Sequence, residues 1–219
     1  MASRAKPTSA QALCTGGWGS SSGEYWKVTT ADGVQYYFGR GKRSATDSLA
    51  LNSAWTVPVF GNHTGEPCYN SSFAASSCEQ VWRWNLDYVV DPSSNTMTYV
   101  YEKETNNYGR NLNTAVSSYT RSGYLARIDY GQRAGTETAN APARVEFTTA
   151  ERCLPSGSMT CTPAELTTAT ASHWPDVPSD LISTSSTSCA GQVSPSFFTR
   201  KRLTTVITKV WNGSAYREV

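Results

Sequence analysis

Short runs of β-branched and aromatic residues, separated by polar turns, recur along most of the 219-residue chain. The clearest pair is residues 81–90 and 96–103, which flank a turn at residues 91–95. In the second run, apolar residues such as Met97 and Tyr99 occupy every other position, and this period of two is typical of a strand with two different faces. The pattern predicts an antiparallel hairpin.

The same signals predict further strands along the chain. Residues 25–30 and 34–38 flank an Ala-Asp-Gly turn, and Asp-Gly between two such runs is a strong hairpin signal. In residues 54–61, Pro58 lacks an amide hydrogen, which predicts an edge strand or a bend. The remaining predicted strands are residues 124–130, 143–150 and 202–211, the last followed by an Asn212-Gly213 turn.

Polar segments without either period separate these strands. Residues 1–22 are rich in Ser and Gly and are predicted to be disordered or loosely attached. Residues 105–120 are predicted to be a loop, and residues 151–196 a long loop insertion with at most one short helical turn. Because a structureless insertion of that length is unusual inside a compact domain, we expect a disulfide and a neighbouring surface to anchor it.

These elements predict an all-β fold of antiparallel hairpins in an open sheet, with residues 23–219 forming a single β segment. The composition agrees, since only 38% of residues are hydrophobic and 16% are charged, which is typical of a turn-rich extracellular β-protein. The net charge of +2 is spread along the chain and argues against a nucleic-acid partner. No apolar run is long enough to span a membrane, and the N-terminal residues lack the apolar core of a signal peptide. If the protein acts outside the cell, its export signal is expected to lie on a longer parent chain or to be absent.

The cysteines indicate an oxidising compartment. Cys68 and Cys78 lie ten residues apart, and Cys153 and Cys161 lie eight apart, in polar segments without zinc-ligand spacing. Closing a ten-residue loop removes about 2.5–3 kcal/mol of unfolded-chain entropy, enough to hold a polar loop in place. We therefore predict the disulfides Cys68–Cys78 and Cys153–Cys161. Two cysteines remain, Cys14 and Cys189, which could form a third disulfide or both be free thiols.

Residues able to perform catalysis are scarce. His63 and His173 both lie in predicted turns, and the chain has no G-x-S-x-G nucleophile motif. Asp87 and Asp91 could be imagined as part of a glycosidase pair with Glu102 or Glu104, but Asp beside a turn usually caps backbone amides, and the two glutamates are expected at an exposed strand end. Phosphate-binding, metal-binding and dinucleotide motifs are absent from the sequence. We expect no enzymatic activity, no cofactor and no metal.

Aromatic residues are the best binding candidates, with seven Trp and twelve Tyr in the chain. Trp82 and Trp84 are two apart on one predicted strand, so they would share a face. Such a pair could form a sugar-stacking contact face. In β-proteins it is more often buried between layers, and we favour packing.

Four strand-rich stretches of this chain resemble the Rhs, or YD-repeat, proteins of actinobacteria, a family of large secreted proteins: "YWKVTTADGVQYYFG", "WRWNLDYVVDPSSNTMTYVYEKETNNYGRN", "GYLARIDYG" and "RKRLTTVITKVW". The loop pieces "NSAWTVPVFGN", "GEPCYNSSFAASSC", "APARVEFTTAERCLP" and "HWPDVP" extend the resemblance to roughly residues 24–219. One Y-x-x-D-x-x-G motif would be a weak signal, but many pieces in one order make a strong one.

The resemblance implies a strip of hairpins that spirals into a hollow shell, of which this chain is an N-terminal part. In the family such a shell encloses a C-terminal toxin or effector, as in polymorphic toxins, or forms an extracellular adhesive barrel. The implied partners are the remainder of a longer YD-repeat chain and an enclosed toxin or effector, at a secreted, extracellular or cell-wall-associated location. The "DPSSN" turn at Asp91 lacks the glycine of the family's D-P-x-G self-cleavage stretch, so no catalytic residue is implied. Relatives often carry a second cysteine shortly before the one that matches Cys189, and its absence here favours a free thiol.

The sequence thus predicts a structural segment of a secreted Rhs/YD-repeat protein. One alternative, from a different class, is a secreted carbohydrate-binding β-sandwich that uses exposed Trp side chains on a glycan. A less favoured alternative is a small hydrolase that uses His173 and nearby acids, which would require a carboxylate within hydrogen-bond reach of that histidine.

Overall fold

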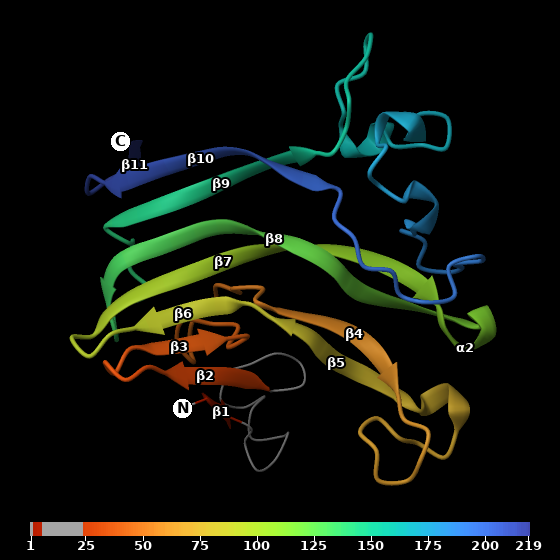
Figure 1. Cartoon of the computed structure of the whole chain (residues 1–219), viewed down its shortest axis with the longest axis horizontal. Coiled ribbons are helices and arrows are strands. Elements are labelled where there is room, and N and C mark those ends of the chain that lie inside the picture. The colour runs from red at the N-terminus through yellow and green to blue at the C-terminus, as the bar shows by residue number, and fades with distance from the viewer. Residues whose placement is uncertain (1, 6–23) are drawn as a thin grey trace.

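The computed structural model describes residues 2–5, main chain only, and residues 24–219. Antiparallel strands dominate the described residues, with a few helical turns, and the predicted all-β class is confirmed (Figure 1). The strands are β1 (Ala2–Ala5), β2 (Tyr25–Thr29), β3 (Gln35–Phe38), β4 (Ala54–Phe60), β5 (Ser77–Trp84), β6 (Leu86–Val90), β7 (Asn95–Gly109), β8 (Ala115–Arg133), β9 (Ala143–Glu151), β10 (Lys201–Trp211) and β11 (Tyr216–Glu218). The helical turns are η1 (Phe73–Ala75), α2 (Arg110–Asn113), η2 (Pro163–Glu165), η3 (Ala171–His173) and η4 (Ser179–Leu181).

Nine of these strands form one sheet in the order β1-β2-β3-β6-β7-β8-β9-β10-β11, with every pairing antiparallel. Figure 1 shows them following one another across the molecule, with the β4–β5 hairpin, a separate two-stranded sheet, to one side. The described strands do not close into a barrel. The prediction of an open antiparallel sheet is therefore confirmed.

One predicted strand, residues 81–90, is two strands in the structure. The chain leaves the β4–β5 sheet at Asn85 and enters the large sheet as β6, which pairs with β3 and β7. Asn85 is buried, and its main-chain and side-chain nitrogens both donate to the Ser53 carbonyl, at 2.8 and 3.0 Å. These hydrogen bonds join residues more than thirty positions apart and fix the point where the chain passes from one sheet to the other. No local sequence signal predicts that point.

The prediction of a loop over residues 105–120 is wrong. Most of that segment extends β7 and β8, which pair with each other up to the short turn at α2. The polar strand is stabilised from outside the hairpin. Asn106 donates from Nδ2 to the Leu181 carbonyl at 2.8 Å and accepts the Ser183 amide at 2.8 Å. Tertiary hydrogen bonds therefore override the low β-propensity of Asn and Ser.

The β4–β5 hairpin packs against the far half of the long β7–β8 hairpin. Its Val57 and Trp82 meet Tyr108 of β7 and Tyr119 of β8 in a small apolar cluster. Pro58 lies in β4, which pairs with β5 on one side only in the described structure and so is an edge strand, as predicted.

The 151–196 insertion is more ordered than the sequence suggests. Three 3-10 turns, η2, η3 and η4, wind around a core of their own, in which Trp174 is 1% exposed and packs with Cys153 and Val177. The disulfides Cys68–Cys78 and Cys153–Cys161 both form, so the expected anchoring of the long loops by disulfides is confirmed. The insertion is held by this core as well as by its disulfide.

The predicted disorder of residues 1–22 falls mostly outside the described residues, as does Cys14. Within that segment the structure differs from the prediction at Ala2–Ala5, because this short strand pairs with β2.

Candidate functional surface

One face of the nine-stranded sheet carries an unbroken row of apolar side chains. Residues directly opposite each other in antiparallel strands place their side chains on the same face, so the register defines the row. From β2 to β10 it contains Val28, Tyr36, Val89, Met97, Tyr130, Ala143 and Val210.

A second and a third apolar set flank this row on the same face. Because side chains of alternate residues along a strand share a face, Tyr99, Ile128 and Val145 lie beside the row in β7, β8 and β9. Phe147 and Val206 are paired one step further along β9 and β10. We call the row and these five residues the apolar face. It crosses seven strands.

The apolar face remains accessible to solvent. Val206 is 52% exposed and Val210 is 43% exposed, and the other members are half-buried. None of them is buried, so no segment within the described residues seals this face. A contiguous exposed apolar area usually marks an interaction surface, for further polypeptide, a membrane or a ligand.

The opposite face of the same strands is polar, and its middle is buried. Its central row contains Lys27, Tyr37, Tyr88, Thr98, Asp129, Arg144 and Lys209. Tyr88 is 3% exposed, Thr98 is fully buried and Asp129 is 2% exposed.

Polar partners compensate the burial of Tyr88 and Asp129, whereas the Thr98 hydroxyl has no hydrogen-bond partner within the described residues. Arg40 lies over the Tyr88 ring at 4.4 Å, and the Tyr88 hydroxyl donates to Glu137 Oε1 at 2.7 Å. Burial is the main reason that the pKa of Tyr88 is raised. Asp129 forms ion pairs with Arg127 at 2.9 Å and Arg144 at 3.1 Å, the second without hydrogen-bond alignment. Antiparallel sheets with one solvated face normally bury the apolar one, so the arrangement here is reversed.

Asp87 lies at the junction between the two sheets and is fully buried. Its Oδ2 atom accepts the Ser53 hydroxyl at 2.6 Å and the Gly41 amide at 2.7 Å, while Oδ1 has no hydrogen-bond partner in the described structure. Burial raises the pKa of this carboxyl to about 7, against the opposing effect of those hydrogen bonds and of Arg40. The turn-capping role considered for Asp87 is wrong, because its partners are 34 and 46 residues away.

Strand β10 presents an open edge. Strand β11 pairs only with its last residues, and the Val219 amide donates to the Thr208 carbonyl at 3.1 Å. On that side, residues 201–207 have no strand partner among the described residues. An unpaired strand edge is a template for pairing with further polypeptide.

Trp82 and Trp84 each contact a different part of the chain. The Trp82 indole donates to the Thr120 carbonyl at 3.0 Å, and its ring lies 4.7 Å from the Phe197 ring. Trp84 donates to the Glu24 carbonyl at 3.2 Å and meets Trp26 edge-on. Both are half-buried, and these contacts favour packing over sugar stacking.

Among the residues that the structure describes, neither histidine contacts both a serine and an acid. His173 Nδ1 lies 3.1 Å from the Leu154 carbonyl oxygen, a main-chain partner. The His63 side chain is 76% exposed and lies 3.4 Å from Glu66. In the part of the chain that the structure describes, no three His, Cys, Asp or Glu side chains form a group that could hold a metal ion. Those residues also include no helix long and apolar enough to cross a membrane.

The acids singled out in the sequence have separate structural roles. Asp91 accepts the Asn95 amide at 2.8 Å and caps its turn, as predicted. Glu104 differs from the expected exposed strand end, since it is 7% exposed and pairs with Arg121 at 2.8 Å. Cys189 is buried and free, with the Ser183 hydroxyl 3.0 Å from its sulfur.

Comparisons with known proteins give a distant likeness. No protein-family model and no curated protein matches the chain. Among solved structures, TcdB2-TccC3 matches with a TM-score of 0.32 and 13% identity over 90% of this chain and 10% of the other. Structures of TcdB2-TccC3-Cdc42 and TcdB2-TccC3-TEV match with TM-scores of 0.30 and 0.29, at 14% and 15% identity. In both cases the match covers 85% of this chain and less than a tenth of the other. At these scores the likeness carries no argument about function.

Proposed function

We propose that this chain is a non-catalytic structural segment of a secreted Rhs/YD-repeat protein. In this role it forms part of a β-shell, and the apolar face lines the side of the shell that meets the enclosed polypeptide. The observation that carries the proposal is the reversed sheet: the middle of its polar face is buried inside the chain, while its apolar face stays accessible. The repeated strand and turn motifs of residues 24–219 support the assignment to this family. The open edge of β10 offers unpaired main-chain groups to which a further strand of the proposed shell would pair.

A carbohydrate-binding sandwich finds less support. A sandwich places a second sheet over the apolar face of the first, and the β4–β5 hairpin instead packs against Tyr108 and Tyr119 at the far end of β7–β8. The tryptophans singled out for sugar contact donate their indole nitrogens to main-chain carbonyls.

Amide hydrogen exchange at Val206 tests whether the sheet continues. The Thr208 carbonyl faces β11, and alternate residues of a strand point their main-chain groups to the same side, so the Val206 amide faces the open edge. In the isolated chain we expect this amide to exchange as an unprotected one. In the protein encoded by the full reading frame, we expect the exchange rate of this amide to fall by about 100-fold or more, because a carbonyl of a further strand accepts its hydrogen bond.

The Ile207 amide is the internal control. It faces β9 and should be protected in both samples. Equal exchange at Val206 in the two proteins would contradict the proposal that β10 pairs with a further strand.

A further inference from the structure

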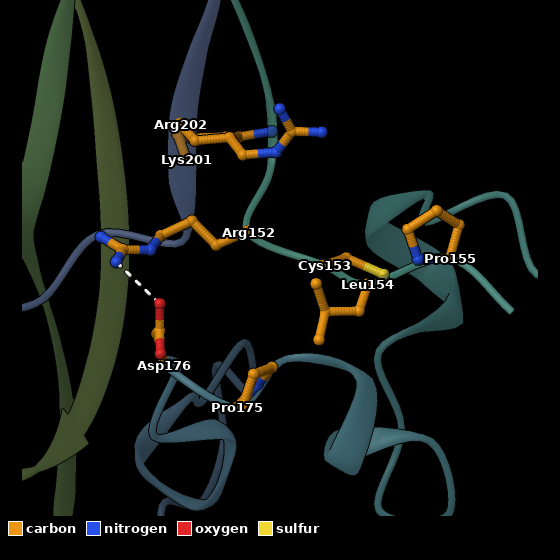
Figure 2. A pocket seen from close by; sticks show the side chains of 8 residues that line it. All are labelled: Arg152, Cys153, Leu154, Pro155, Pro175, Asp176, Lys201 and Arg202. Atoms are coloured by element: carbon orange, nitrogen blue, oxygen red, sulfur yellow. Dashed lines mark hydrogen bonds and ion pairs between the residues drawn. The ribbon is translucent and has the colours of Figure 1, made fainter.

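A pocket lies where β9, β10 and the 151–196 insertion meet. Its volume is about 480 Å³, within the usual range for small-ligand sites. Figure 2 shows Lys201 and Arg202 on one side, Arg152 paired with Asp176 on another, and Leu154 on a third, next to Cys153. We propose that this pocket binds an acidic peptide segment, in which an Asp or Glu carboxylate meets the arginines and a neighbouring apolar side chain meets Leu154. This proposal is independent of the shell function.

The cationic side chains of the pocket differ in how far their hydrogen-bond donors are already used within the chain. Lys201 Nζ pairs with Glu151 at 2.6 Å. Although burial acts in the opposite direction, hydrogen bonds from Lys201 and Arg200 hold the pKa of Glu151 below its ordinary value, which keeps it charged. Arg202 donates only its Nε, to the Glu151 carbonyl at 3.2 Å, and no acceptor within the described residues takes its terminal nitrogens.

Arg152 is the second available cation. It pairs with Asp176 at 3.0 Å, and the two side chains are 37% and 65% exposed. An ion pair this exposed contributes little, so an incoming carboxylate can replace Asp176 at small cost. The planar fork of a guanidinium matches a carboxylate through two parallel hydrogen bonds, which a lysine cannot provide. Arg202 and Arg152 therefore define the anionic half of the ligand.

The other half of the pocket is apolar and aliphatic. Leu154 is 62% exposed and lies beside Pro155 and Pro175. These side chains offer contact area to an apolar group. None of the lining residues is aromatic, and sugars bind largely by stacking on aromatic rings. A carboxylate next to an apolar side chain, as in a peptide, fits both halves better than a uronic acid or a phosphate.

The pocket is fixed before any ligand arrives. Glu151 and Lys201 are paired across β9 and β10, and the Cys153–Cys161 disulfide closes the loop that follows. The Leu154 amide donates to the His173 carbonyl at 2.8 Å, which ties this loop to η3. A pre-formed site loses less conformational freedom on binding.

Titration of the full chain with short peptides tests the proposal. The probe is acetyl-Gly-Leu-Asp-Gly-amide, followed by NMR shifts of the residues that line the pocket. We expect saturable binding, and about tenfold weaker binding of the Asn analogue, because a charged hydrogen-bonded pair is lost. Glucuronic acid and inorganic phosphate are measured beside it. Binding of either as tight as the Asp peptide, or no shift with the Asp peptide at millimolar concentration, would overturn the proposal.

Two variants separate the pocket from general effects. Arg202→Gln should weaken binding of the Asp peptide by about tenfold. Arg217 is an exposed arginine on β11, and Arg217→Gln should leave the affinity for this peptide unchanged. Asp176→Asn removes the competing carboxylate and should strengthen binding several-fold, a gain that misfolding cannot produce. Unchanged affinity in both Arg202→Gln and Asp176→Asn would refute the site.

Discussion

Replacing Trp174 by alanine should cost about 3–5 kcal/mol of unfolding free energy, the range for losing a large aromatic side chain from a core. Trp174 is the most buried residue of the 151–196 insertion and the centre of its cluster with Cys153 and Val177. Its indole also donates to Glu151 at 3.3 Å, so its loss leaves a buried carboxylate with one partner fewer. Urea denaturation monitored by circular dichroism measures the effect.

Trp211→Ala is the matched control for Trp174→Ala. Trp211 is half-buried at the end of β10, and its ring centroid lies 5.0 Å from that of Tyr216. We expect this second substitution to cost clearly less. If both variants lost the same stability, or if Trp174→Ala lost under about 1 kcal/mol, the insertion would not depend on its own core.

The stability of the protein should fall between about pH 4 and pH 7 through Asp87, and Asp87→Asn should remove this fall. The pKa of the buried carboxyl is about 7 in the folded protein, above its ordinary value of 3.8. In this window the folded state keeps a proton that the unfolded chain has released, so the stability that Asp87 contributes is complete below pH 4 and lost by pH 7. The size is about 4 kcal/mol as an upper limit, at about 1.4 kcal/mol per pKa unit.

The difference between variant and wild-type unfolding free energies isolates Asp87 from other titrating groups. An asparagine oxygen can still accept from Ser53 and Gly41 without carrying a charge. The unfolding free energy of Asp87→Asn should therefore rise relative to that of the wild type as the pH rises from 4 to 7. Asp91→Asn, at an exposed turn, should keep the wild-type fall over the same range. Parallel curves for Asp87→Asn and the wild type would show that the carboxyl is ionised in the fold.

Local patterns in the sequence sufficed for the hairpins and the disulfides. Asp-Gly between residues 25–30 and 34–38, and the turn at residues 91–95, are complete signals within a few positions. The Cys68–Cys78 and Cys153–Cys161 pairs lie close enough in sequence for each pairing to be predicted from its short, polar intervening loop. The resemblance to YD-repeat proteins likewise rests on short strand and turn motifs.

The structural features that could not be predicted depend on contacts between residues that lie far apart in the sequence. The change of sheet at Asn85 needs Ser53, and the strand that replaces the predicted loop needs Leu181 and Ser183 to satisfy Asn106. Alternation at Met97 and Tyr99 identified a face that prefers to be buried. Only the register across the other strands shows that this face continues from β2 to β10, and only the exposure of its residues shows that nothing in the described chain covers it.

Hydroxyl-radical labelling of Met97 tests most directly whether the apolar face is left for further polypeptide to cover. In the isolated chain, Met97 should be oxidised readily, while buried Tyr88 should not react. In the protein encoded by the full reading frame, Met97 should be protected and the exposed Tyr69 should react equally in both samples. Equal labelling of Met97 in the isolated chain and in the longer protein would contradict the account.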